Sequence, residues 1–304
     1  MDPLSDVISL LKPRSYSAGG LDAGGAWSVQ FPRHEGIKCY AVASGECWLS
    51  VAEMPAAVHL HAGDCFLLPT ARPFCLASDL ESPPVDFKAI VSTPLNGGIV
   101  PVNGGGECFI VGGHFTLSGN HADFLSGVLP PVVHLQTESD KAELRWSLER
   151  MGQELREDRP GALLVVRHLA HMMLVQALRL HLAHGPRGGV GWLFALADEQ
   201  MSTVINALHE DPAQRWTLQK MAERAAMSRS IFALKFRQTV GTSPMEYLTR
   251  WRMLLAGDRL QNSTDPISVI ALSLSYESES AFSKAFKRVM GCSPRQYARR
   301  HGPQ

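Results

Sequence analysis

The chain has 304 residues, of which 45% are hydrophobic and 19% are charged, so it resembles an ordinary soluble protein long enough for two domains. No uninterrupted apolar run approaches the roughly 18 residues that span a bilayer, and the first residues lack the basic segment of a signal peptide. We therefore expect a cytoplasmic protein without a membrane span. The zero net charge is uneven: residues from His209 onward hold 15 basic and 8 acidic side chains, whereas residues 1–208 hold 14 and 21. The resulting charge of +7 predicts that the C-terminal part meets a polyanion.

Residues 1–26 are rich in Gly, Ser and Pro, which predicts an arm with little regular structure. Short apolar runs separated by turn residues follow, and they predict strands at 27–31, 38–43, 47–51, 58–60, 65–68, 74–77 and 108–111. Residues 44–46 and 62–64 have the composition of tight turns, and residues 96–106 that of a glycine-rich loop. This pattern predicts a small antiparallel β-barrel or sandwich, which we delimit at residues 1–135.

Residues 136–192 change to a helical period. Leu144, Leu148, Met151 and Leu155 form one apolar stripe, and 163–182 is a second helix that is apolar over much of its surface. Such a helix is either buried or paired with another chain. Because readers of duplex DNA commonly act as dimers, we interpret this segment as a homodimerisation element that ends in the glycine-rich linker 185–191.

Residues 193–304 contain an imperfect internal repeat, in which 218–247 returns as 267–297. The recurring positions pair at offsets of 49 and then 50 residues: Ala222 with Ala271, Phe236 with Phe286, Gly241 with Gly291, Ser243 with Ser293, Pro244 with Pro294, and Tyr247 with Tyr297. Each copy predicts a short helix, a turn, an amphipathic helix and a capped Ser-Pro helix start. Two similar units at a fixed separation predict one type of surface used twice.

Each copy has the order of a helix-turn-helix unit, whose second helix enters the major groove of DNA. Phe232, Phe236 and Val240 are expected to face inward in the first copy, and Phe282, Phe286 and Val289 in the second. The opposite faces supply candidate DNA contacts: Arg229, Ser230, Ala233, Leu234 and Arg237, then Glu279, Ser280, Ser283, Lys284, Lys287 and Arg288. Lys284 could reach a guanine edge, whereas Ser and Ala can contact bases or thymine methyl groups. Arg250, Arg252, Lys287, Arg288, Arg299 and Arg300 are better placed for phosphates.

Residues 193–300 resemble the DNA-binding domain of the AraC/XylS family of transcription regulators. The matching segments are Ala222-Glu-Arg-Ala-Ala-Met-Ser228, Phe232-x-x-x-Phe236, Gly241-Thr-Ser-Pro-Met-Glu-Tyr-Leu248, Arg252-Met-x-x-Ala256, Ile267-x-x-Ile-Ala271, Phe282-Ser-Lys-Ala-Phe-Lys287 and Gly291-Cys-Ser-Pro-Arg-Gln-Tyr297. The resemblance implies seven helices with two helix-turn-helix units, joined by a long helix at 244–260 and reading successive major-groove faces. Two departures are Ser275-Tyr276, where the family usually has Gly-Phe, and the apolar pair Ala233-Leu234, where members often carry polar base readers.

The N-terminal part resembles the cupin-like sensor domain of some family members. The matching segments are Gly45-Glu-Cys-Trp48, Leu60-x-Ala-Gly-Asp-Cys-Phe-Leu-Leu-Pro69 and Leu129-Pro-Pro-Val-Val-His134. The resulting fold class is α+β, with an antiparallel β-barrel, then helices, then an all-α double helix-turn-helix domain. From strand alternation we expect an effector cavity lined by Trp27, Phe31, Tyr40, Trp48, Phe66 and Phe74, with His114 as a further candidate.

A cupin also raises the alternative of a metal-dependent dioxygenase or isomerase, which needs several convergent ligands. Phe74 stands where the metal-binding His of the second cupin motif is expected, His59 and His61 are out of place for the first motif, and His34 lacks a clear partner. We therefore predict no catalytic residue, metal or cofactor. A constitutive repressor with a vestigial barrel is the other alternative.

The sequence thus predicts a transcription regulator, an activator that binds double-stranded DNA, contacts RNA polymerase and responds to a small molecule held in its N-terminal barrel.

Overall fold

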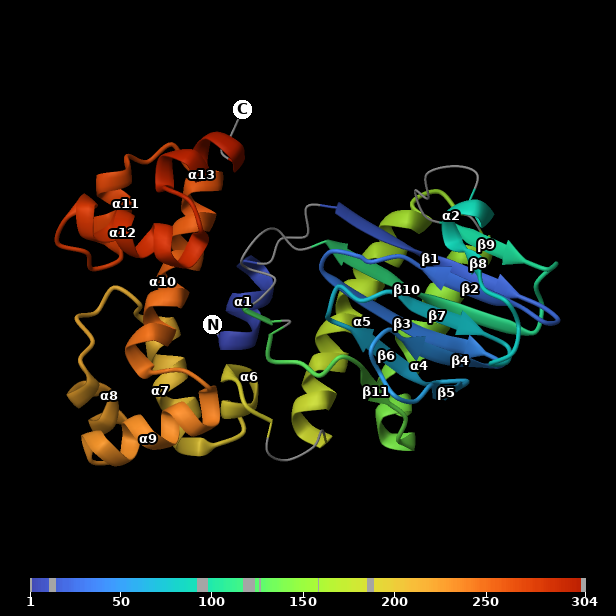
Figure 1. Cartoon of the computed structure of the whole chain (residues 1–304), viewed down its shortest axis with the longest axis horizontal. Coiled ribbons are helices and arrows are strands. Elements are labelled where there is room, and N and C mark those ends of the chain that lie inside the picture. Colours follow the sequence, from blue (N-terminus) through green and yellow to red (C-terminus); the bar gives the residue numbers. More distant parts are fainter. Residues whose placement is uncertain are drawn as a thin grey trace. The chain divides into compact units, whose positions relative to one another are not determined.

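The computed structural model describes residues 2–10, 15–91, 98–116, 124–125, 127–157, 159–184 and 189–301 (Figure 1). The chain divides into two compact units. The first, here called the β unit, comprises residues 13–117 and 129–185, and the second, the helical unit, comprises residues 1–12, 118–128 and 186–304. These boundaries differ from those expected from the sequence, because the helices of 138–184 pack on the strands and the first residues pack on the C-terminal helices.

The β unit is built from two sheets. The six-stranded sheet has the order β11-β6-β3-β10-β1-β9. Its strands are β1 (Ser15–Ala23), β3 (Ile37–Ser44), β6 (Cys65–Leu68), β9 (Ile99–Val102), β10 (Cys108–Thr116) and β11 (Val133–Leu135). The five-stranded sheet has the order β5-β4-β7-β2-β8. Its strands are β2 (Ser28–Phe31), β4 (Glu46–Val51), β5 (Val58–His61), β7 (Phe74–Ala77) and β8 (Val85–Asp86), and the short helix α2 (Phe87–Ile90) follows.

The expected α+β fold class is confirmed, with two facing sheets rather than one closed barrel. Neighbouring strands are antiparallel except for the pairs β1–β9 and β2–β8. Alternation is clear in β4, where Cys47, Leu49 and Val51 are buried in the core while the residues between them are more exposed. The tight turns expected at 44–46 and 62–64 have Gly45 and Gly63 at positive φ, +78° and +87°.

The segment 1–26 differs from the expected unstructured arm, because it forms α1 (Pro3–Leu10) and strand β1. The glycines of β1 reflect close packing. A side chain at Gly19 would lie 2.7 Å from the carbonyl oxygen of Gly98, and one at Gly20 would lie 2.8 Å from the ring of Phe109. The strand therefore lacks the apolar alternation by which strands are recognised in a sequence.

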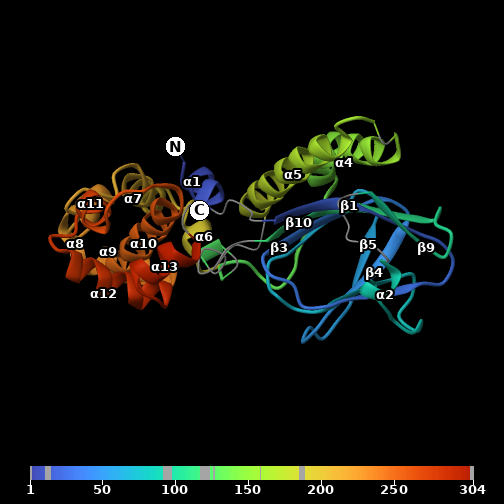
Figure 2. The ribbon, with the colours of Figure 1, turned by 90° about the horizontal axis from the view of Figure 1, so that it is seen from above.

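Two antiparallel helices, α4 (Glu138–Glu157) and α5 (Ala162–His184), lie side by side along the six-stranded sheet (Figure 2). The stripe Leu144, Leu148, Met151 and Leu155 is buried, as expected. Helix α5 is long and apolar enough to cross a membrane by composition alone, but it packs on α4 and on strands of the sheet. This packing is that of a core helix, and its outer face leaves Leu164 and Met172 exposed.

The helical unit contains the seven helices that the resemblance implies, α7 to α13. They are α7 (Glu199–Glu210), α8 (Leu218–Arg224), α9 (Arg229–Val240), α10 (Pro244–Asn262), α11 (Ile267–Ser273), α12 (Glu279–Met290) and α13 (Pro294–His301), preceded by the short α6 (Trp192–Ala195). Long helix α10 packs against α8 and α9 and also against α11, α12 and α13, so it joins the two copies of the repeat (Figure 1).

Helix α1 completes the helical unit by packing on α7 and α10. Asp6 places a carboxylate oxygen 3.4 Å from Nδ1 of His209, and Nε2 of His209 lies 2.7 Å from the hydroxyl of Tyr247. The imidazole also stacks on Trp251, with ring centroids 3.9 Å apart. The N-terminal segment is therefore tied to the core between the two helix-turn-helix units.

Candidate DNA-binding surface and ligand cavity

Helices α9 and α12 present the same pattern of exposure over all twelve of their positions, at a constant offset of 50 residues. Each begins at a Ser N-cap, Ser228 or Ser278, and ends at a left-handed Gly, Gly241 or Gly291. Such local caps fix where the helix begins and ends and therefore which face is turned inward.

The inward faces follow the sequence expectation with one change. Phe232, Phe236 and Val240 are buried in α9, and Phe282 and Phe286 are buried in α12. The third buried residue of α12 is Met290, whereas Val289 is only half-buried against the same cluster. The spacing i, i+4, i+8 therefore holds in both copies.

The outward faces differ in chemistry at matching positions. Leu234 of α9 is 60% exposed, and Lys284 is the exposed equivalent in α12. Ala233 and Ser283 are half-buried at the preceding position, and Arg237 matches Lys287. Exposed positions that the sequence interpretation left out are Ile231, Gln238 and Ala281, which the helix period would have included.

The turns before both helices contain a residue other than Gly in the left-handed region, Ala226 (φ +53°) and Ser275 (φ +65°). Both turns are closed by the same bond, from Met227 N to Ala222 O at 2.9 Å and from Tyr276 N to Ala271 O at 3.0 Å. Both copies therefore have a residue other than Gly at the left-handed position of the turn. The left-handed conformation of a residue with a side chain costs on the order of 1 kcal/mol in each turn. Tyr276 packs edge-on against Phe282 and fills the core.

The basic residues fall into two groups. Within the described residues, Lys284 and Lys287 form no ion pair and are exposed. Arg229 and Arg237 are also exposed, and so are the serines Ser230 and Ser280 on the same faces. Others are engaged: Arg288 and Arg250 lie 3.0 and 3.5 Å from the carboxylate of Glu246, and Arg295 lies 3.9 Å from Glu279. Arg252 is half-buried and donates to the carbonyl oxygens of Pro212 and Gln214 at 2.7 and 2.9 Å, so it braces the loop before α8.

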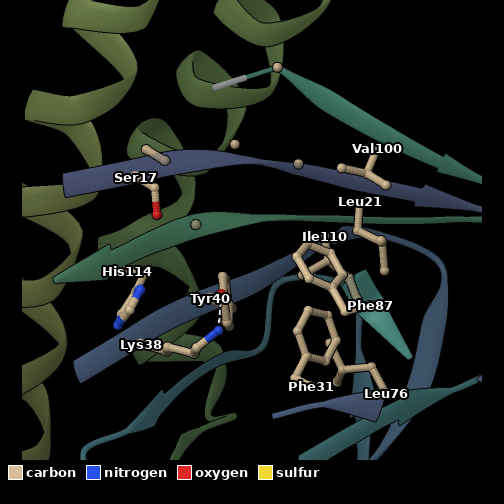
Figure 3. A pocket seen from close by; sticks show the side chains of 15 residues that line it. Ser17, Leu21, Phe31, Lys38, Tyr40, Leu76, Phe87, Val100, Ile110 and His114 are labelled. Atoms are coloured by element: carbon tan, nitrogen blue, oxygen red, sulfur yellow. Dashed lines mark hydrogen bonds between the residues drawn. The ribbon is translucent and has the colours of Figure 1, made fainter. Parts of the chain in front are cut away.

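A separate cavity of about 180 Å³ lies between the two sheets of the β unit (Figure 3). Its wall comes from β1, β3, β9 and β10 on one side and from β2, β7 and α2 on the other. The lining is Ser17, Ala18, Gly19, Gly20, Leu21, Phe31, Lys38, Tyr40, Leu76, Phe87, Gly98, Val100, Ile110, Gly112 and His114. The space suits a small ring or short chain, because a cavity of about 150 Å³ holds benzene.

Lys38 is the cationic group of this mostly apolar cavity, although its side chain is buried and the residue is only 8% exposed. Its Nζ lies 3.3 Å from the hydroxyl of Tyr40 and about 5 Å from the ring centres of Phe31 and Phe74. Among the described residues, no carboxylate lies within ion-pair distance of Nζ. Burial lowers the pKa of Lys38 to about 8.

Two histidines lie close to Lys38. His114 places Nε2 2.5 Å from the carbonyl oxygen of Glu35, and burial lowers its pKa. His34 lies edge-on to His114, and its pKa is lowered to about 4 by burial and by the charge of Lys38. Both rings are therefore neutral near pH 7, which leaves Lys38 as the positive charge at this end of the cavity.

The residues proposed from alternation are distributed over three places. Tyr40, Phe31 and His114 line the cavity, whereas Trp27, Phe66 and Phe74 belong to the hydrophobic core. Trp48 lies on the outer face of β4, where it stacks on His59 with ring centroids 4.3 Å apart. Lys38 was not among the candidates, although a Lys inside a strand of apolar residues is a visible signal.

Comparison with known proteins gives a family match for the N-terminal part of the chain and another for the C-terminal part. The family model described as Cupin matches residues 2–183, and that described as Helix-turn-helix domain matches residues 221–300. An AraC-like transcription regulator of Streptomyces lividans is 43% identical over 302 residues, which is 99% of each chain. The chain belongs to the AraC family of transcription regulators.

Two further regulators are similar at lower identity. RclR of Escherichia coli, an RCS-specific HTH-type transcriptional activator, is 29% identical over 310 residues, covering 99% of this chain and 98% of its own. The solved DNA-binding domain of AdpA, in complex with a target DNA, is 29% identical, covers 32% of this chain and 87% of its own, and has a TM-score of 0.31. AraC-type helix-turn-helix domains bind DNA, so this chain is a DNA-binding transcription regulator with an N-terminal cupin domain.

Proposed function

We propose that α9 and α12 each enter a major groove of the same DNA duplex. The helix-turn-helix unit of α9 and that of α12 would then recognise different chemical features of the bases. The observation that carries this proposal is their common exposure pattern combined with different outward chemistry. In α12, Lys284 and the partly exposed Ser283 supply hydrogen-bond donors for base edges. In α9, Leu234 and Ile231 supply apolar contacts suited to thymine methyl groups, while Arg229 and Arg237 contact phosphates.

We further propose that the effector is a small amphipathic molecule held in the Lys38 cavity. Its apolar part would fill the space between Phe31, Leu76 and Phe87, and an anionic or strongly accepting group would lie against Lys38. The uncompensated charge of Lys38 supports this assignment, because a buried ammonium group without a counter-ion is costly and gains most from an anionic partner.

The path from cavity to DNA would begin at β1. Ser17 to Leu21 of β1 line the cavity, and the chain runs back through residues 11–14 to α1, which Asp6 ties to His209. A ligand that binds one conformation of β1 more tightly than another would increase the population of the first. That shift would in turn change how often α1 is packed on the helical unit. The protein would act as an activator that contacts RNA polymerase in one of these states.

A homodimer is part of the same proposal. The outer faces of α4 and α5 expose Trp146 and Leu164, 62% and 60% exposed, on helices whose other faces pack on the sheet. Exposed apolar side chains of this size on neighbouring helices are typical of a protein interface. Pairing through them would bring two copies of the helical unit to adjacent half-sites.

The test is selection of genomic fragments by the full-length protein, followed by binding titrations on the selected site with candidate amphipathic acids. The proposal expects the ligand to change operator affinity in the wild type and not in Lys38→Met. If no acid bound by the protein changes operator affinity, the chain is instead a constitutive DNA-binding protein.

A further inference from the structure

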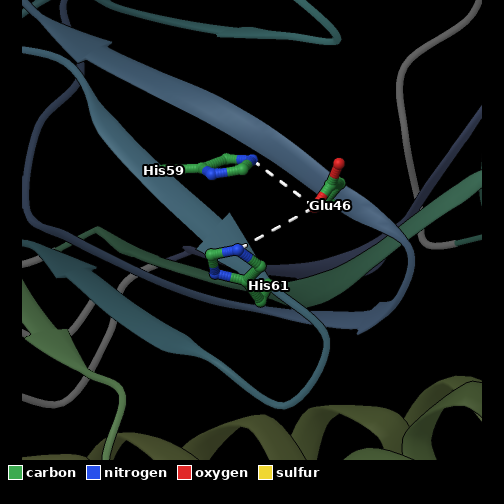
Figure 4. Close-up of side chains that lie close together, drawn as sticks. All are labelled: Glu46, His59 and His61. Atoms are coloured by element: carbon green, nitrogen blue, oxygen red, sulfur yellow. Dashed lines mark ion pairs between the residues drawn. The ribbon is translucent and has the colours of Figure 1, made fainter.

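Three side chains with metal-binding atoms meet on the outer face of the five-stranded sheet (Figure 4). In the antiparallel register of β4 and β5, Glu46 pairs with His61 and Trp48 pairs with His59. Cys47 and Leu60, which alternate with them, belong to the hydrophobic core. Alternation therefore turns Glu46, His59 and His61 to the outside.

The three groups are close enough to share one ion. Nε2 of His59 and Nε2 of His61 lie 3.6 and 3.8 Å from Oε2 of Glu46, and the three ligand atoms all lie within 4.8 Å of one another. Ligands about 2.0–2.1 Å from a tetrahedral Zn²⁺ are separated by roughly 3.3 Å, so small rotations of these side chains suffice. Two imidazoles and a carboxylate form a mixed N/O set that suits zinc and neighbouring transition metals.

The surroundings of His61 and His59 resemble the supporting groups of metal-binding histidines. Nδ1 of His61 lies 4.0 Å from Oδ2 of Asp64, a side chain that is 1% exposed. Asp64 is itself fixed by the His61 backbone N–H at 3.0 Å, by His134 at 2.9 Å and by Lys141 of α4 at 3.1 Å. A carboxylate that hydrogen-bonds to the second ring nitrogen orients a ligating histidine and raises its basicity, and Asp64 would have to approach His61 by about 1 Å to form that bond. Trp48, stacked on His59, restricts that ring in turn.

We propose that Glu46, His59 and His61 form a divalent transition-metal site, with Zn²⁺ as its best-fitting ion and a water molecule as fourth ligand. The site is separate from the Lys38 cavity, because its ligands project from the opposite side of the five-stranded sheet to the core residues that face the cavity. An occupied site would join β4 to β5 and, through Asp64, stiffen the contact with α4.

The experiment titrates tag-free, full-length protein with Zn²⁺ by calorimetry and with Co²⁺ by visible absorption. We expect about one ion per chain with a Kd on the order of 1 μM or below. Glu46→Gln should weaken binding by at least about tenfold, and His59→Gln/His61→Gln should abolish it. His168→Gln removes an exposed histidine from α5 and serves as the matched control, with unchanged binding. Far-UV circular dichroism should be the same for all four proteins.

Asp64→Asn tests the supporting role separately. It should leave the Co²⁺ spectrum tetrahedral while reducing affinity, because it keeps the three ligands and removes the charge behind His61. The proposal is overturned if the wild type binds no more Zn²⁺ than the double histidine variant, if its Kd is millimolar, or if Glu46→Gln binds as tightly as the wild type.

Discussion

Leu234 and Lys284 occupy equivalent positions on α9 and α12, and both side chains point away from a core of two phenylalanines. One position thus carries an apolar branch in the first unit and a cation in the second. Because the helices share their caps and their buried faces, the difference lies in the outward chemistry and not in the backbone. The two units should therefore respond differently to changes in the DNA.

Lys284→Ala should lower affinity for the operator and relax the preference at one base pair. The expected loss of binding free energy is about 1–3 kcal/mol on the best operator. It should be much smaller on an operator in which the contacted base pair is already changed, because a base contact depends on the sequence and a phosphate contact does not. Fluorescence anisotropy with a panel of single-base variants measures both. Lys88→Ala, an exposed lysine of α2, is the control. Equal weakening on every sequence would instead assign Lys284 to a phosphate.

Leu234→Ala should weaken binding only where α9 meets a thymine methyl group. Replacing each dT of the operator by dU removes the methyl group and keeps the base pair, so one such change should reduce wild-type affinity by about 1 kcal/mol. The same change should have no effect on Leu234→Ala, and dU at other positions should be neutral for both proteins. If the variant and the wild type lose equal affinity at every dU, Leu234 contacts no methyl group.

Lys38→Met should stabilise the ligand-free protein near neutral pH. Burial lowers the pKa of Lys38 from 10.5 to about 8, so between these values the unfolded chain binds more protons and the free energy of unfolding rises with pH. Below about pH 8 the whole penalty, about 3 kcal/mol, is present, and Met removes it. Urea unfolding should show the largest difference at pH 7 and a vanishing one above about pH 10.5. A less stable variant at pH 7 would contradict a charged, uncompensated Lys38.

Leu164→Glu should convert a dimer into a monomer without unfolding it. Leu164 is exposed on α5, so a carboxylate is tolerated in the free chain but would be desolvated in an interface. Light scattering after gel filtration, with circular dichroism on the same samples, makes the measurement. Leu80→Glu changes a leucine of similar exposure (59%) away from these helices and should leave the mass unchanged. A dimeric Leu164→Glu protein would place the interface elsewhere.

Most helix boundaries of α8 to α13 could be predicted from the sequence, because their signals are local. Ser243 caps α10 and Pro244 begins it, as the sequence indicates, while Ser228 caps α9 and Gly241 ends it in the left-handed conformation. Each of these residues acts within one turn of its own helix. The repeat then confirmed each assignment a second time.

Features that depend on distant partners could not be predicted in the same way. The docking of α1 through Asp6 and His209 joins residues some 200 positions apart, and the approach of Glu46 to His61 depends on strand register. The outward position of Trp48 shows the second difficulty. Alternation allows either face of β4 to point inward, and the prediction chose the face of Trp48, but Cys47, Leu49 and Val51 occupy the core face.

Four of the residues around the Lys38 cavity are glycines, at positions 19, 20, 98 and 112. Any other residue there adds atoms to a wall that is now bare backbone. At Gly112 the first added carbon would collide with the backbone of Cys39 and Tyr40, whereas at Gly20 it would meet the ring of Phe109. The room in this cavity therefore depends on side chains that are absent, and an alanine at Gly19, whose added carbon would lie 2.7 Å from the carbonyl oxygen of Gly98, should narrow the cavity while leaving α9 and α12 unchanged.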